Sequence, residues 1–229
     1  MAVIRVRAVL VEERTRLVNS ARGISKSAGE RLATCDTDQM GIEQLEGLPA
    51  WLQETVKPLL EQVKSLTEAI KKIDVEIEQI ARTRYPETAL LRQVSGVGPL
   101  IALTFVLTVD DKERFEKSRD VGCYLGLRPK SGESGEKQPE LRITKEGDVY
   151  LRKLLVQGAH CILSRRGPDT DLKRWGLKLA GRGGKNAKKR AIVAVARKLA
   201  VMLHSLWVSA EVYEPLRNTL ARQRARPAA

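Results

Sequence analysis

Apolar residues recur along residues 56–80 at spacings that alternate between three and four, with Glu, Gln and Lys at most positions between them. This is the spacing of a helix that packs along a narrow apolar row. At 1.5 Å per residue such a helix extends over about 37 Å, and we interpret residues 51–86 as a coiled-coil arm. Its predicted contact positions are Val56, Leu59, Val63, Leu66, Ile70, Ile73, Ile77 and Ile80.

The apolar row of the arm leaves two pairing partners open. A row of only two positions per heptad is typical of a coiled-coil seam, whereas a helix on a globular core needs a wider stripe. The arm can therefore pair with a second copy of the chain, which we favour, or fold back on the first helix as an intramolecular hairpin. The seam pattern alone does not say which helix is the partner.

The remaining pattern predicts further helices and a mainly α fold. Residues 1–50 contain a helix with a basic side, over 5–32, and a connector. A compact helical domain is expected over 87–215, with amphipathic or apolar helices at 149–163 and 188–207, and a basic flexible tail over 216–229. The order is therefore a basic N-terminal helix, a long arm, and a compact domain.

A glycine-rich turn, VSGVGPLIAL, separates two apolar stretches at the start of this domain. Gly96 and Gly98 permit a tight turn, and Pro99 suits the first position of a helix. The exposed amides at such a helix start can bind a phosphate. The turn indicates a helix-hairpin-helix element in which Gly96 and Gly98 contact DNA backbone, or an ordinary turn between two helices.

The net charge of +13 is concentrated at one end of the chain. Residues 141–229 carry 20 Lys and Arg against 6 Asp and Glu, a net charge of +14, which leaves −1 for residues 1–140. Such a basic region is typical of a protein that binds a phosphate backbone; solubility or a membrane-surface patch is the alternative. The candidate contacts are Arg142, Lys145, Arg152, Lys185, Lys188, Lys189 and Arg190.

The last four of these cations gather at the start of the helix expected over 188–207. The N-terminal end of a helix carries partial positive charge and favours anions. Cations in this place do not help the helix, so they are better explained by a bound polyanion.

Other chemistry is sparse in the sequence. Cys35, Cys123 and Cys161 lie far apart without metal-ligand spacing, and we interpret them as buried thiols in a reducing compartment. His160 and His204 lie on apolar helical runs as core or boundary residues. No signal peptide and no apolar run of membrane-spanning length is expected, so the predicted location is cytoplasmic, next to the nucleoid, without a membrane partner. No metal site is predicted.

Four blocks, in order, carry a resemblance to a known family: VSGVGPLIAL, YLGLRPKSGESG, RITKEGDVYLRKLLVQGA and KKRAIVAVARKLAVML. Together they resemble the C-terminal transposase domain of the insertion-sequence-110 family, over about residues 90–215. The resemblance implies a DNA recombinase that moves an insertion element under the direction of an element-encoded bridge RNA. It also implies a serine nucleophile between the second and third blocks. Ser134 matches that position best, and Ser131 is the alternative.

The resemblance also implies a magnesium-binding, resolvase-like domain before the arm, and we expect this sequence to lack it. Two hypotheses follow. In the first, the chain is a serine-dependent DNA transposase, or its C-terminal part, whose metal-binding half lies elsewhere. In the second, it is a catalytically inactive, truncated transposase that acts only as a dimeric nucleic-acid-binding protein. A generic helix-hairpin-helix repair protein would explain the glycine turn but not the later blocks.

Overall fold

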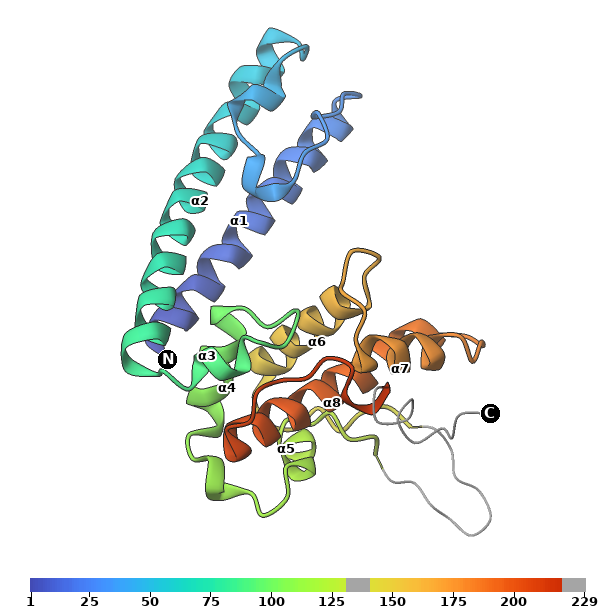
Figure 1. Ribbon diagram of the computed structural model, residues 1–229. Coiled ribbons are helices and arrows are strands. Elements are labelled where there is room, and N and C mark those ends of the chain that lie inside the picture. The colour runs from blue at the N-terminus through green and yellow to red at the C-terminus, as the bar shows by residue number, and fades with distance from the viewer. Residues whose placement is uncertain (131–140, 220–229) are drawn as a thin grey trace. The chain divides into compact units, whose positions relative to one another are not determined.

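The computed structural model describes residues 1–130 and 141–219, and these are mainly helical, as predicted. The chain divides into two compact units, Met1–Gln79 and Ile80–Ala229. The predicted N-terminal helix, its connector and most of the arm together make the first unit. The predicted compact domain lies within the second, and Figure 1 labels the helices of both.

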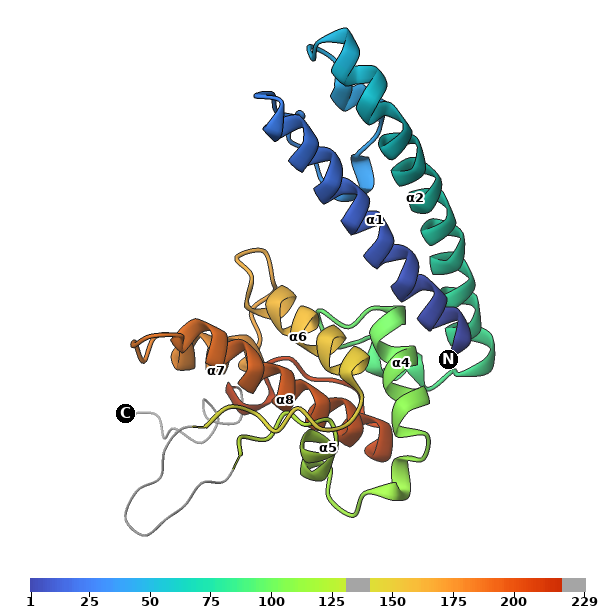
Figure 2. The ribbon, with the colours of Figure 1, turned by 180° about the vertical axis from the view of Figure 1, so that it is seen from behind.

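The first unit is a hairpin of two antiparallel helices joined by a connector (Figures 1 and 2). Helix α1 spans Ala2–Ser27, and α2 spans Ala50–Arg84, which extends beyond the end of this unit. The connector contains two short 3-10 turns, Thr37–Gln39 and Ile42–Leu45. A small apolar cluster joins the three segments: Val18, Ala21, Met40, Leu45, Leu48, Leu52, Val56, Leu60 and Val63.

The buried row on α2 differs from the predicted row by one position in each heptad. Half of the predicted row is buried, namely Val56, Val63, Ile70 and Ile77. The other half is only partly buried: Leu59, Leu66, Ile73 and Ile80. The next residue along the helix is buried after three of these, namely Leu60, Thr67 and Ala81. Asp74, which follows Ile73, is partly buried and contacts Arg7 on α1.

Polar contacts from α1 explain why Thr67 and Asp74 face the first helix. Arg7 forms an ion pair with Asp74, and Nη1 of Arg14 donates a hydrogen bond to Oγ1 of Thr67 at 3.3 Å. Each pair joins residues more than fifty positions apart, so together they set the register of the hairpin. The intramolecular hairpin, the second of the two predicted pairings, is therefore present within one chain, and pairing with another copy stays a prediction.

The second unit packs its helices around one apolar core. Helix α8 (Ala187–Ser209) contacts α5 (Arg119–Tyr124), α6 (Val149–Leu163) and α7 (Asp171–Ala180). Helix α4 (Pro99–Val109) packs on α6, and the single turn α3 (Thr88–Leu91) packs on α4 and α8. A 3-10 turn, Lys112–Arg114, also contacts α8. The helix bounds predicted at 149–163 and 188–207 agree with α6 and α8 to within two residues.

Two of these helices begin at side-chain caps. Oδ1 of Asp148 accepts a hydrogen bond from the backbone N of Leu151 at 2.6 Å at the start of α6, and Oγ1 of Thr170 accepts one from Lys173 N at 3.0 Å at the start of α7. Such caps satisfy donors that the first helical turn leaves unpaired. Both helices therefore begin where their sequences place an Asp or a Thr.

Helix α8 corrects the expectation that no apolar segment is long enough to cross a membrane. In the described part of the chain it is the one helix that passes that test by length and composition. It also lies at the centre of this unit, with nine buried residues, including His204. A core helix passes the same test, so the length and composition of α8 are explained by its place in the core.

The first residues of the predicted tail contact α7. The backbone N of Asp171 donates to Pro215 O at 2.8 Å, and Oδ2 of Asp171 accepts from Asn218 N at 2.7 Å. These contacts attach residues 215–219 to the start of α7. The prediction of buried thiols is wrong, since Cys35 and Cys123 are partly buried and Cys161 is exposed.

Candidate nucleic-acid interface

The segments on either side of residues 131–140 are paired with each other as a short antiparallel bridge. Lys130 N donates to Arg142 O at 3.0 Å, Thr144 N to Arg128 O at 2.9 Å, and Lys145 N to Gly126 O at 3.0 Å. Pro129 and Ile143 form the bridge between the two segments. We call residues 126–130 and 142–145 the loop base. It holds Lys130 and Arg142, which flank residues 131–140, side by side. Residues 131–140, with Ser131 and Ser134, lie outside the described residues.

Close backbone approaches join the loop base to the residues around it. At Gly126 an added Cβ would overlap the backbone of Glu146, and at Gly147 it would overlap the carbonyl oxygen of Tyr124. Both glycines have positive φ, of 65° and 72°, a conformation that residues with a side chain rarely adopt. The glycines of the YLGL and EGD motifs are therefore needed for the fold of this site.

A buried arginine ties the loop base to α6. The Arg152 side chain is in the first turn of α6 and the residue is only 8% exposed. Its Nη1 donates to Leu125 O at 3.0 Å and to Glu146 O at 2.6 Å. One guanidinium nitrogen thus connects the segments before and after residues 131–140, and it satisfies two carbonyl groups that would otherwise lose their partner.

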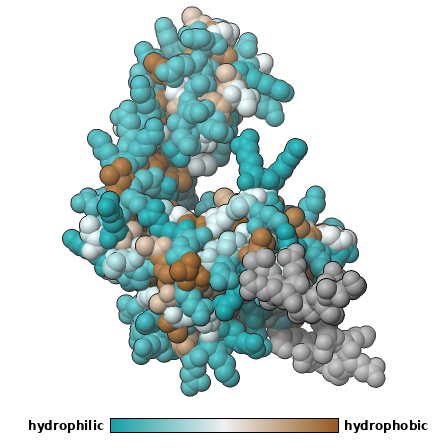
Figure 3. Space-filling view, in the orientation of Figure 1, coloured by the Kyte–Doolittle hydropathy of each residue, from teal (hydrophilic) through white to brown (hydrophobic). Residues whose placement is uncertain are grey.

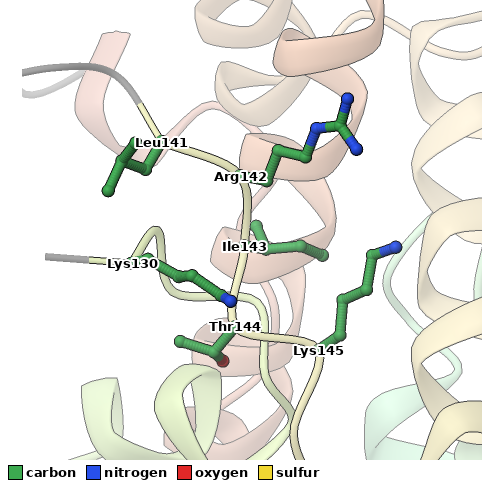
Figure 4. Close-up of a pocket in the computed structure, with 6 residues that line it drawn as sticks. All are labelled: Lys130, Leu141, Arg142, Ile143, Thr144 and Lys145. Carbon is green, nitrogen blue, oxygen red and sulfur yellow. The ribbon is translucent and has the colours of Figure 1, made fainter. Parts of the chain in front are cut away.

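The outer side of the loop base is basic. Arg128, Lys130, Arg142 and Lys145 are all exposed. A shallow concavity of about 450 Å³ is lined by Lys130, Leu141, Arg142, Ile143, Thr144 and Lys145. In Figure 4 the side chains of Arg142 and Lys145 extend to the same side of the segment, away from Leu141. Oγ1 of Thr144 is buried and has no hydrogen-bond partner among the described residues.

A second basic group lies at the start of α8. Lys185, Lys188, Lys189 and Arg190 are exposed there, as the sequence predicted, and the first turn of α8 contains no acidic residue. Asn186, at the N-cap, has a φ of 70°. Figure 3 shows that the visible face of the molecule is mostly hydrophilic, with apolar residues in small separate patches. The positive charge at the start of α8 is thus presented to solvent, where a polyanion could reach it.

Comparison with known proteins identifies the family. Residues 88–173 match the Transposase IS116/IS110/IS902 family. The transposase for insertion sequence element IS1111A of Coxiella burnetii is 31% identical over 219 residues, which cover 93% of this chain and 59% of that protein. A probable family 20 transposase of Pseudomonas aeruginosa is 30% identical over 219 residues, covering 92% of this chain and 64% of that protein.

The chain belongs to this transposase family. It spans between 53% and 64% of the length of the first four curated relatives it matches. The region that matches the IS116/IS110/IS902 family includes the glycine turn, the loop base and α6, and it ends before α8. The part that defines the family therefore contains the close backbone approaches of Gly126 and Gly147.

Within the family region, the structure gives Arg152 a different task from the one predicted. Its guanidinium is buried and donates to backbone carbonyls, so it supports the loop base instead of lying on the exposed basic surface. Sequence reasoning grouped Arg152 with the candidate nucleic-acid contacts of the basic region 141–229. The sequence did contain a signal for the burial of Arg152, because apolar positions that α6 buries lie near it, among them Leu151 and Leu155.

The glycine turn also serves packing. Gly96 has a φ of 83°, and a Cβ there would lie 2.8 Å from the carbonyl oxygen of Gly158 on α6. Gly98, the N-cap of α4, is exposed and has no atom within 4 Å of the place of its Cβ. Gly96 is thus needed where two backbones meet, whereas Gly98 faces open space. DNA contact by either glycine stays a prediction.

The two histidines differ in burial, since His160 is exposed on α6 whereas His204 is buried. Burial lowers the pKa of His204, whose Nε2 lies 2.9 Å from Lys112 O and whose Nδ1 lies 3.0 Å from Ser118 Oγ. These contacts agree with the predicted core role. In residues 1–130 and 141–219, no group of three or more His, Cys, Asp or Glu side chains could hold a metal ion. The described residues do not fit the magnesium that the resemblance implies, and we derive no step through it.

Proposed function

We propose that this chain acts in DNA transposition, and that its second unit holds a DNA strand against the segment 131–140. The loop base is the observation that carries the proposal. Pairing across the base brings together the residues that flank the serine-containing segment, and exposed cations lie on them, among them Lys130, Arg142 and Lys145. Cations and backbone amides position a phosphate backbone without reading its sequence.

In the proposed reaction a serine of this segment attacks a DNA phosphodiester. The Ser134 Oγ–phosphorus bond forms as the bond from phosphorus to the leaving sugar oxygen breaks. The proton of the serine hydroxyl is removed, and the leaving oxygen takes up a proton, so the exchange needs no oxidant or reductant. A serine hydroxyl needs a base or a metal ion to become an effective nucleophile. The cations of the loop base would lower the negative charge that an attacking oxygen meets.

We further propose that the chain acts with a bridge RNA and self-associates through the hairpin of α1 and α2. The proposed location is the cytoplasm. The basic group at the start of α8 supports a phosphate-backbone partner, which can be DNA or RNA. The alternative is a catalytically inactive protein that only binds nucleic acid. It is favoured by the absence of a metal-binding group from the described residues.

Trapping of a covalent protein–DNA adduct on denaturing gels distinguishes an active transposase from a protein that only binds nucleic acid. We expect labelled duplex DNA and magnesium to yield an adduct when the carboxylate-containing portion of a longer relative and its RNA are supplied, and none from this chain alone. Ser134→Ala should abolish the adduct while DNA affinity stays nearly unchanged, because one hydroxyl adds little to binding that phosphates dominate. Ser131→Ala is the matched control and should retain the adduct.

DNA affinity is measured with the same proteins as a function of salt. Reversing the charges of Lys188 and Lys189 should weaken binding to all sequences alike and reduce the slope of log affinity against log salt, by roughly 0.9 for each phosphate that is no longer neutralised. Lys117→Glu, an exposed cation on another segment, is the control. Salt-independent binding would contradict the proposal, as would an adduct that survives both Ser134→Ala and Ser131→Ala. Loss of the adduct only in Ser131→Ala would move the nucleophile to Ser131.

A further inference from the structure

Lys145 has a backbone conformation that residues with a side chain rarely adopt. Its φ is 63°, in the left-handed region, where the Cβ of an L-residue crowds the carbonyl oxygen that follows it. Three other described residues besides glycine have a positive φ. Asp110 and Asn186 belong to the residue types that tolerate this region, and Ala210 ends α8, where such a residue is common. Neither explanation applies to Lys145.

Contacts across the loop base hold Lys145 in this conformation. Its backbone N donates to Gly126 O at 3.0 Å, and an added Cβ at Gly126 would lie 2.7 Å from the carbonyl carbon of Lys145. The other two residues with positive φ around the loop base, Gly126 and Gly147, are glycines. At Lys145 the chain therefore has a long side chain in a place where glycine would cost the fold less free energy.

The contacts of the fold do not explain this lysine. Its side chain is exposed, and among the residues that the structure describes its ammonium group has no hydrogen bond or ion pair. Arg152 is the opposite case, since its guanidinium is buried and donates to the carbonyls of Leu125 and Glu146. The use of Lys145 has to come from something that binds its side chain.

The left-handed conformation changes the side of the segment on which Lys145 lies. Side chains alternate along an extended segment, so a regular strand would place Lys145 opposite Arg142, on the side of Ile143, which packs against the core. A φ of 63° differs by about half a turn from the roughly −140° of an extended residue, and this turns the Cβ to the other side. Figure 4 shows the result, because the side chains of Arg142 and Lys145 extend to the same side.

We infer that Arg142 and Lys145 bind the phosphate backbone of one DNA strand as a pair, and that the left-handed conformation of Lys145 brings the two cations to the same side. Both line the concavity of about 450 Å³ at the loop base. Their Cα atoms are at most about 10 Å apart, which is roughly the length of three nucleotides along one strand of a duplex. This inference rests on the proposed function and specifies which cations hold the strand.

Substitutions at Lys145 separate the charge of the side chain from the conformation of the backbone. Lys145→Gly removes both the charge and the strain, so it should raise the midpoint of thermal unfolding by about 2–4 °C. Lys145→Ala removes the charge and keeps the strain, so its midpoint should stay within about 1 °C of the wild type. Lys117→Gly is the matched control at an exposed lysine without positive φ, and it should lower the midpoint.

Binding of a labelled duplex DNA, followed by fluorescence anisotropy at several salt concentrations, measures the other half of the inference. Lys145→Gly and Lys145→Ala should weaken binding equally, by about fivefold, the upper end for one exposed ion pair. Each should reduce the slope of log affinity against log salt by roughly 0.9. Arg142→Ala should give the same loss. Lys145→Arg keeps the charge and should bind like the wild type, as should Lys117→Ala.

Two results would overturn the inference. One is a Lys145→Gly protein no more stable than Lys145→Ala, and the other is wild-type affinity in Lys145→Ala. If only the charge reversal of Lys188 and Lys189 weakened binding, the proposed nucleic-acid binding would stand and the pair of Arg142 and Lys145 would be rejected. These assays need neither magnesium nor a longer relative, so failure of the DNA adduct leaves their results unchanged.

Discussion

The two units join segments that are distant in sequence by different kinds of contact. In the hairpin, side chain meets side chain, as in the Arg7–Asp74 ion pair. In the second unit, the contacts around the loop base and the glycine turn are made to backbone: Arg152 donates to carbonyls on both sides of residues 131–140, and Gly96 lies against Gly158. A side-chain pair can be replaced by another pair, whereas a backbone contact depends on one residue type.

The contacts of the two units also differ in how much they contribute to stability, because they differ in burial. The Arg7 and Asp74 side chains are 21% and 43% exposed, and an ion pair in such a place contributes about 1 kcal/mol or less. A buried carbonyl that loses its donor costs about 1–3 kcal/mol. The second unit should therefore be the more sensitive of the two to single substitutions, even though its apolar core is the larger.

Arg152→Leu should have the largest effect. Two carbonyls beside the loop base would lose a charged donor, and we expect the second unit to lose about 3 kcal/mol of unfolding free energy. Chemical denaturation followed by circular dichroism measures this. The exposed neighbour Arg142→Leu is the control and should change stability by less than about 0.5 kcal/mol. Equal effects of the two substitutions would show that Arg152 does not support the loop base.

Gly96→Ala should have an intermediate effect. A side chain at a φ of 83°, with its Cβ 2.8 Å from Gly158 O, should cost about 2 kcal/mol through backbone strain and displacement of α6. Gly98→Ala in the same turn is the matched control, because its φ is −89° and the space around it is open. Thermal unfolding of the two variants compares them. A Gly96→Ala protein as stable as the wild type would mean that the turn and α6 can separate at little cost.

Asp74→Ala should have the smallest effect, a loss of about 1 kcal/mol, because Arg7 keeps partial access to water. The double variant Arg7→Leu with Asp74→Leu should recover that loss or exceed wild-type stability, since apolar pairs often replace partly buried ion pairs without cost. A double-mutant cycle by chemical denaturation measures the coupling. If the double variant were the least stable of the set, this pair would be as irreplaceable as the backbone contacts of the second unit.

Local pattern was enough to predict the long helices, but not α5 or α7. The seven-residue repeat of α2 and the apolar run of α8 depend only on neighbours within one or two turns. For the same reason the basic group at the start of α8 and the family blocks could be recognised in the sequence alone. Ser134 was also found this way, but it lies outside the described residues, and its role rests on the resemblance alone.

Tertiary contacts decided which side of each helix is buried. Adjacent rows on α2 differ by only about 100°, and the apolar character of Leu66 and Ile73 favoured the row that the seam does not use. Thr67 and Asp74 take the seam because their partners, Arg14 and Arg7, lie 53 and 67 residues away. The burial of Arg152 was hidden in the same way, since the carbonyls that it contacts come from segments that approach it only after folding.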